Sequence, residues 1–193
     1  MNNENPNVFP QNEIEKLPNS FYSHAEAIYH LSEVGIEVKQ TRVADWLGVS
    51  RANVSQVIGR MQNSGLIELS DDLMLTEKGS YLAKMISRRR RIIERFLSEI
   101  LDLPWDQVYK ETKKWENVLS PVTEDAMLKI LGNPTTGIFG NPIPYSGYFE
   151  GPMKRLLDVK VNKKYNIVKI SEELKKDSSV ISFLQKNKIL PGN

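Results

Sequence analysis

Two short helices joined by a tight turn that contains Gly48 constrain the fold of this chain more than any other feature. Thr41 to Gly48 and Arg51 to Ser64 each repeat apolar residues with helical spacing, and Gly48 and Gly65 end the two helices. Their inward faces carry Val43, Ala44 and Leu47 in the first helix and Val54, Val57, Ile58 and Met61 in the second. Strand-like segments at 66–69 and 73–76 follow, joined by the polar turn Ser70-Asp71-Asp72. This order predicts a winged helix-turn-helix.

The outward edge of the second helix carries side chains that suit DNA. Gln and Asn can pair with adenine, Arg with guanine or phosphate, and Ser with phosphate oxygens. The predicted DNA-binding residues are Thr41, Arg42, Ser50, Arg51, Asn53, Ser55, Gln56 and Arg60. Two alternatives stay open: a solvated polar face without a ligand, and a helix-turn-helix that binds another protein. Specific DNA binding would differ from both in its steep salt dependence.

The remaining chain is expected to be mainly helical. Helices are predicted from Phe21 to Gly35, from Ser80 to about Leu101, from Trp105 to about Leu119, and from Pro121 to Leu131 with Ser120 as N-cap. A loop rich in Gly and Pro spans 132–152. The tail predicts a strand over Val161 to Ile170 and then a helix from about Ser178 to Lys186.

Several segments together resemble the diphtheria toxin repressor and manganese transport regulator family. They are AIYHLSEVGIEVKQTRVADWLGVSRANVSQVIGRMQNSGLIEL, LTEKGSYLAKMISRRRRIIERFL, KWENVLS and FGNPIP (139–144), and the tail resembles the start of a FeoA-like β-barrel. The resemblance implies a flexible tail at 1–20, a winged helix-turn-helix DNA-binding domain at 21–80, a helical dimerisation domain at 81–150, and a linker with a truncated FeoA-like segment at 151–193. Gln56 falls on the family's base-reading position.

Family members bind a divalent cation between the first helix and the dimerisation helices, and several of those ligand positions differ here. Ser23, Arg90, Tyr109, Lys113 and Asn117 replace side chains that bind metal in the family, whereas two carboxylates are kept. We therefore hypothesise that salt bridges replace the metal and that no cofactor is needed. The residues of this former metal site are Glu26, Arg90, Glu94, Lys113, Glu116 and Asn117.

Two other interpretations of these charges stay open. Glu26, Glu94, Glu116 and Asn117 could bind Mn²⁺ or Fe²⁺ as relocated oxygen ligands, a set that favours manganese. Alternatively, the charges are solvated helix faces. The run Arg88 to Arg91 is expected to divide around its helix: Arg90 toward the former metal site, Arg91 toward the FGNPIP loop near Asn141, and Arg88 or Arg89 into solvent.

Composition excludes several classes of protein. The chain is 40% hydrophobic and contains no cysteine, so it can fold but cannot form disulfides or thiolate metal sites. The chain has no apolar run of about 18 residues, so no membrane span is predicted. Phosphate-binding glycine loops, zinc-binding motifs and nucleophile motifs are also lacking, so no enzyme and no small-molecule substrate are expected. The predicted function is a cytoplasmic, homodimeric regulator of transcription that binds a palindromic operator in double-stranded DNA.

Overall fold

The computed structural model describes residues 17–33, 35, 37–68, 72–116 and 118–192. The chain divides into two compact units between Ile86 and Ser87, called here the N-terminal unit and the C-terminal unit. Most of the tail predicted at 1–20 lies outside the described residues. Along the described chain, no helix is long and apolar enough to cross a membrane.

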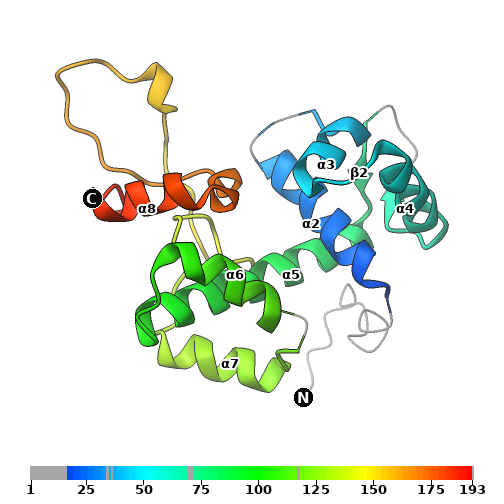
Figure 1. Cartoon of the computed structure of the whole chain (residues 1–193), viewed down its shortest axis with the longest axis horizontal. Helices are drawn as coiled ribbons and strands as arrows, with labels where there is room; N and C mark the ends of the chain where they lie inside the picture. The colour runs from blue at the N-terminus through cyan, green and yellow to red at the C-terminus, as the bar shows by residue number, and fades with distance from the viewer. Residues whose placement is uncertain (1–16, 34, 36, 69–71, 117, 193) are drawn as a thin grey trace. The chain divides into compact units, whose positions relative to one another are not determined.

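The N-terminal unit contains the predicted helix-turn-helix and its wing (Figure 1). Its helices are α2 (Asn19–Glu33), α3 (Gln40–Leu47), α4 (Arg51–Asn63) and the first part of α5 (Glu77–Arg95). The strands β1 (Ile67–Glu68) and β2 (Met74–Leu75) pair antiparallel, with Ile67 opposite Leu75. Ser70 and Asp71 of the predicted turn lie outside the described residues. The winged helix-turn-helix fold is therefore confirmed.

One apolar core fixes α3 and α4 against α2. Ile28 of α2, Val43 of α3 and Val54 of α4 are each almost completely buried in it. Gly48, with φ of 66°, ends α3 in the left-handed conformation that glycine adopts without strain. Ser50 then begins α4 by accepting a hydrogen bond from the Asn53 amide. Since the apolar face of α4 is used for packing, its polar edge is left in solvent.

The C-terminal unit is also built mainly from helices. It contains the rest of α5, a π-helical turn (Phe96–Ile100), α6 (Trp105–Trp115), α7 (Pro121–Ile130), the 3₁₀ turns η2 (Leu156–Asp158) and η3 (Glu172–Lys176), and α8 (Ser178–Lys186). The predicted cap of α7 is present, because the Ser120 hydroxyl accepts from the Thr123 amide. Helix α8 packs against α6, and Ile181 of α8 is buried with Trp105 and Leu97.

The strand predicted from Val161 to Ile170 is wrong. This segment is described throughout and contains no strand, although the helix predicted after it forms as α8. A strand needs a continuous ladder on a neighbouring strand. Here single bonds hold the segment instead, from the Ile170 amide to the Phe139 carbonyl and from the Gly192 amide to the Ile167 carbonyl. The expected partial β-barrel is replaced by a chain that lies against the FGNPIP loop.

Gly140 of the FGNPIP loop allows this close approach. Its φ is 78°, and an added Cβ would overlap the carbonyl oxygen of Val168. Gly147 has a similar φ of 74° but open space around the Cβ position. Both glycines therefore have the left-handed backbone conformation, but only Gly140 also lacks room for a Cβ atom.

Gly140→Ala should therefore destabilise the C-terminal unit more than Gly147→Ala does. The left-handed conformation alone costs a non-glycine residue about 1–2 kcal/mol, which both variants should show. The overlap with Val168 should add about 1–3 kcal/mol more at Gly140. Urea unfolding of the two variants measures the difference, and equal losses would show that the segment at Val168 is not held against the loop.

Candidate functional site

The predicted DNA-binding residues lie along one edge of the helix-turn-helix. Thr41 is half-buried near the start of α3, and all the others are exposed: Arg42, Ser50, Arg51, Asn53, Ser55, Gln56 and Arg60. Ser50 also caps α4, and the guanidinium of Arg60 lies over the ring of Phe21, with Cζ 5.3 Å from its centroid. That these residues contact DNA stays a prediction.

Lys39, which the sequence analysis did not single out, ties the wing to the start of α3. Its ammonium lies 2.8 Å from the Asp72 carboxylate and 3.0 Å from that of Glu37. The Leu73 amide also donates to the Val38 carbonyl at 2.9 Å. The hydrogen bonds to Asp72 and Glu37 raise the pKa of Lys39, so its charge is retained. The wing is thus held to the segment that enters the helix-turn-helix.

Arg88 and Arg89 of α5 share one acceptor on α7. Their Nε atoms donate to the two carboxylate oxygens of Glu124, at 3.0 and 3.3 Å. Arg88 also donates to the Pro144 carbonyl, and Arg89 donates to that of Glu116. The expectation that one of these arginines is solvated is therefore wrong. Both guanidiniums join α5 to the helices and loop that follow it.

Arg90 and Arg91 turn toward two further acceptors. The Arg90 guanidinium donates to Glu116 Oε2 at 2.7 and 3.0 Å, so the structure brings these two residues of the former metal site together. Arg91 donates to Glu172 Oε1 at 2.9 Å and to the Pro142 carbonyl. Asn141 beside it donates to the Ile170 carbonyl at 3.2 Å. Arg91 thus lies at the FGNPIP loop, as the sequence analysis expected.

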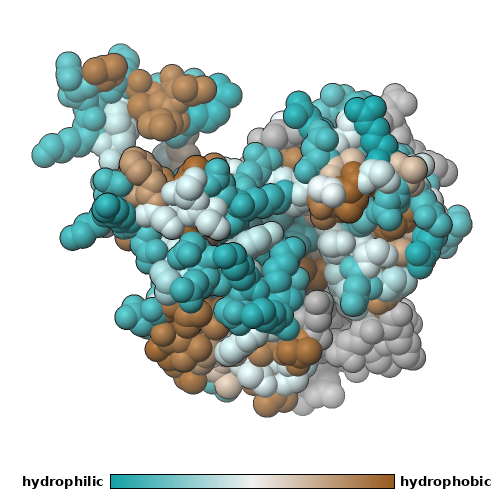
Figure 2. Space-filling view, in the orientation of Figure 1, coloured by the Kyte–Doolittle hydropathy of each residue, from teal (hydrophilic) through white to brown (hydrophobic). Residues whose placement is uncertain are grey.

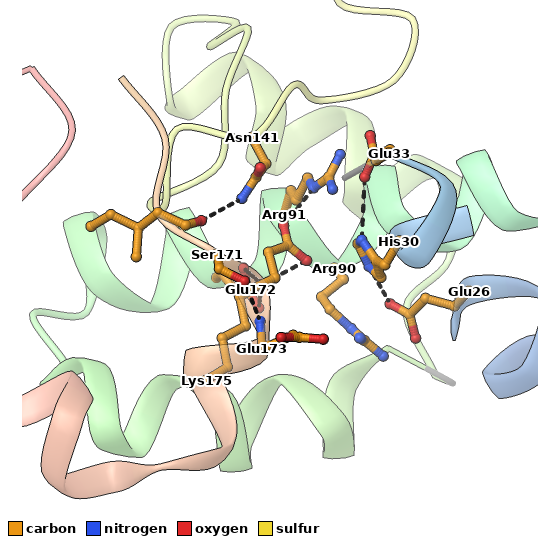
Figure 3. Close-up of polar contacts among 12 residues, drawn as sticks. Glu26, His30, Glu33, Arg90, Arg91, Asn141, Ser171, Glu172, Glu173 and Lys175 are labelled. Carbon is orange, nitrogen blue, oxygen red and sulfur yellow. Dashed lines mark hydrogen bonds and ion pairs between the residues drawn. The ribbon is translucent and has the colours of Figure 1, made fainter. Parts of the chain in front are cut away.

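Four charged side chains form a buried cluster in the C-terminal unit, and Figure 3 labels three of them, Arg91, Glu172 and Lys175. The Lys175 ammonium lies 2.8 and 2.9 Å from the two Glu94 oxygens and 3.3 Å from Glu172. Arg91 is the second cation, so two positive groups face two carboxylates. Burial raises the pKa of Glu94, and the nearby Lys175 ammonium opposes that rise. We call Glu94, Arg91, Glu172 and Lys175 the buried charge cluster.

Lys113 does not belong to this cluster. It is exposed, with its ammonium 5.5 Å from the centroid of the Tyr109 ring, and the lysine that pairs with Glu94 is Lys175. Lys175 lies 81 residues from Glu94 in the chain, which no local sequence pattern could connect. The Asn117 side chain lies outside the described residues.

Glu26, the remaining predicted member of the former metal site, is buried on α2 in the N-terminal unit. Its Oε1 lies 3.5 Å from His30 Nε2, and His30 Nδ1 lies 3.2 Å from Glu33 Oε2 (Figure 3). The His30 ring also stacks on Trp46, with centroids 5.8 Å apart. These contacts give Glu26 a structural partner within α2.

Replacing Lys175 should strongly destabilise the C-terminal unit. Lys175→Met leaves the buried Glu94 carboxylate without its ammonium, a change that costs about 3–5 kcal/mol for buried pairs. The double variant Glu94→Gln/Lys175→Met should lose less, because it removes both charges of the pair. Lys114→Met is the matched control, since Lys114 pairs with Glu111 in solvent and should contribute less than about 1 kcal/mol. If urea unfolding gives equal losses of unfolding free energy for the two lysine variants, the Lys175–Glu94 pair is not a buried ion pair.

Two family models match consecutive parts of the chain. Residues 23–75 match the iron dependent repressor N-terminal DNA binding domain, and residues 76–145 match the iron dependent repressor metal binding and dimerisation domain. The iron-dependent repressor IdeR of Mycobacterium tuberculosis is 40% identical over 133 residues, covering 68% of this chain and 58% of that protein. The diphtheria toxin repressor of Corynebacterium diphtheriae is 36% identical over 123 residues, covering 63% and 54%. The chain therefore spans less than two thirds of these curated relatives.

Solved structures show the same fold. The manganese regulator SloR is similar with a TM-score of 0.60 and 28% identity, covering 68% of this chain and 62% of that one. A manganese-dependent transcriptional repressor in complex with manganese reaches a TM-score of 0.75 at 23% identity, covering 88% and 79%. At that identity the second likeness shows the fold alone.

The expectation that this chain needs no cofactor is wrong, because the family domain matched by residues 76–145 is a metal binding domain. The arrangement of side chains does not itself fit a bound cation. Among the described residues, no three His, Asp or Glu side chains are grouped to hold a metal. Glu94 and Glu116 are instead paired with Lys175 and Arg90. Metal ligation would need these carboxylates in another arrangement.

The matched domains follow each other in the order of the observed fold, a winged helix-turn-helix and then a set of helices. Together with the identity to IdeR and the diphtheria toxin repressor, they assign the protein: this chain belongs to the iron-dependent repressor family.

Proposed function

We propose that this chain is a DNA-binding regulator of transcription that acts as a homodimer and responds to a divalent metal ion, iron or manganese. The observation that carries the proposal is the exposed polar edge of α4, on a helix whose opposite face is buried in the core. The family's DNA binding domain matches the same residues. Neither an enzymatic reaction nor a small-molecule substrate is part of the proposal.

In the proposed complex, the N-terminal half of α4 enters the major groove. There Gln56 pairs with the edge of an adenine, while Arg51 and Arg60 reach phosphates on either side. Ser50 keeps a hydroxyl proton for a phosphate oxygen while its oxygen accepts from the Asn53 amide. The positive end of the α4 dipole favours the approach of the DNA backbone. The wing, held by Lys39, lies beside the same groove.

A second copy of the chain is the proposed partner of an apolar surface in the C-terminal unit. Val122 and Ile130 of α7 are 80% and 61% exposed, and Val118 just before α7 is 80% exposed. Figure 2 shows apolar side chains gathered over α7. Residues 76–145 match a dimerisation domain, which supports a second copy as the partner of this surface. A two-fold axis would then present two α4 helices to a palindromic operator.

The metal response is supported by the family domain rather than by a site already formed in this arrangement. The candidate ligands in the C-terminal unit are Glu94 and Glu116, and oxygen ligands of this kind favour manganese over iron. Glu116 is the most informative of them. It is half-buried and pairs with Arg90, and its replacement should cost the fold less than replacement of the buried Glu94.

Gln56→Ala should weaken binding to a duplex that the wild-type protein selects from a random-sequence library. Loss of a bidentate base contact costs about 1–3 kcal/mol, or about five- to 150-fold in affinity. Gln62→Ala, on the same helix outside the predicted edge, is the matched control and should bind as the wild type does. Competition binding with random duplex measures both variants. If the wild-type dimer prefers no duplex over random competitor, the proposed function is wrong.

Manganese should tighten binding to the selected duplex, and a chelator should reverse the effect. Glu116→Gln should reduce this dependence on metal by tenfold or more, as losses at metal sites commonly do. Glu99→Gln, whose carboxylate pairs with Arg95 at the surface, should respond as the wild type does. Calorimetric titration with Mn²⁺ and Fe²⁺, together with operator binding at fixed metal, gives both measurements. DNA binding that ignores both metal and chelator would contradict the metal response.

A further inference from the structure

One contact joins the first helix of the N-terminal unit to the predicted DNA-binding edge. The Arg60 guanidinium, exposed near the end of α4, lies over the ring of Phe21 with Cζ 5.3 Å from its centroid. Phe21 belongs to α2 and is only 3% exposed, so its ring is held by the core. An immobile ring thus lies under a long, otherwise mobile side chain.

The geometry of a guanidinium lets it stack and donate at the same time. Its five N–H donors lie in its plane, whereas an aromatic ring contacts its face. A phosphate can therefore accept from the edge of Arg60 while Phe21 supports the face. The backbone beneath is also fixed, because the Arg60 carbonyl accepts from the Ser64 amide at 3.1 Å and the Ser64 hydroxyl at 3.0 Å.

We propose that Phe21 is a positioning residue for DNA binding, which orients the Arg60 guanidinium toward a phosphate before the DNA arrives. The inference rests on the proposed DNA-binding function. A free arginine loses rotamer freedom when it binds, and a side chain already stacked loses less. Arg51 at the other end of the same helix offers a comparison, since the described residues place no aromatic ring over its guanidinium.

A double-mutant cycle on DNA affinity tests this inference. The wild type, Phe21→Leu, Arg60→Ala and the double variant are titrated, with manganese chloride present, against a duplex that the wild type selects from a random library. Phe21→Leu should weaken binding about two- to five-fold. The same change should have no further effect once Arg60 is alanine, because the group that Phe21 orients is then absent.

The salt dependence separates positioning from a direct contact. Arg60→Ala should lower the slope of log affinity against log salt by about one, because one phosphate contact is lost. Phe21→Leu should leave the slope unchanged. In the Arg51→Ala background, Phe21→Leu should keep its full two- to five-fold effect on affinity. A general loosening of the fold would instead weaken the contributions of both arginines, so the effect of Phe21→Leu would shrink in both backgrounds. Thermal unfolding confirms that each variant is folded.

Each outcome decides the inference. Additive effects of Phe21→Leu and Arg60→Ala would overturn it and leave the proposed function intact. If Phe21→Leu does not fold, Phe21→Met replaces it, because methionine fills an apolar core and lacks the aromatic face. A loss of affinity by Phe21→Met that disappears once Arg60 is alanine supports the inference, and an additive loss overturns it. A wild-type protein that prefers no duplex overturns both proposals.

Discussion

Four consecutive arginines on α5 organise the C-terminal unit. Because successive residues of a helix point about 100° apart, the four guanidiniums leave α5 in different directions and reach different partners. Two of them meet Glu124 on α7, Arg90 meets Glu116 at the end of α6, and Arg91 meets Glu172 in the C-terminal segment. A single helix therefore connects segments that lie far apart in the chain. Apolar packing around Ile93 and Leu97 fills the space between these connections.

The buried charge cluster is the costly part of that arrangement. Removing Glu94 and Lys175 from water carries a desolvation penalty that their mutual attraction offsets only with close, well-directed contacts. The cluster meets that condition, because both Glu94 oxygens lie within 2.9 Å of the Lys175 ammonium, and Glu172 pairs with both Arg91 and Lys175. Such a pair contributes little net stability. Any arrangement that separates the segment at Lys175 from α5 would leave buried charges unpaired, which disfavours such an arrangement.

Glu94 and Glu116 are also the candidate ligands of the proposed metal response. The family to which the chain belongs has a metal binding domain at these helices, whereas here Glu94 and Glu116 already have cationic partners.

In the N-terminal unit, apolar and polar side chains lie on opposite faces of α4. One face of α4 is buried with α2 and α3, and the other faces solvent and is the surface proposed to bind DNA. Phe21 belongs to that core and contacts the exposed edge, so packing within the unit reaches the surface proposed to bind DNA.

The sequence by itself determined the local elements: the two helices around Gly48, the capped start of α7 at Ser120, and the polar edge of α4. Periodicity and caps act over a few residues, so the sequence pattern contains them. One boundary still differs from the prediction. Helix α5 begins at Glu77 rather than at Ser80, because the Thr76 hydroxyl accepts a hydrogen bond from the Gly79 amide. Only the tertiary structure decided the partners of the charges. It placed Lys175 rather than Lys113 beside Glu94, and it left 161–170 without a strand. Those outcomes depend on contacts between residues up to 81 positions apart, which three-dimensional packing creates and local patterns do not encode.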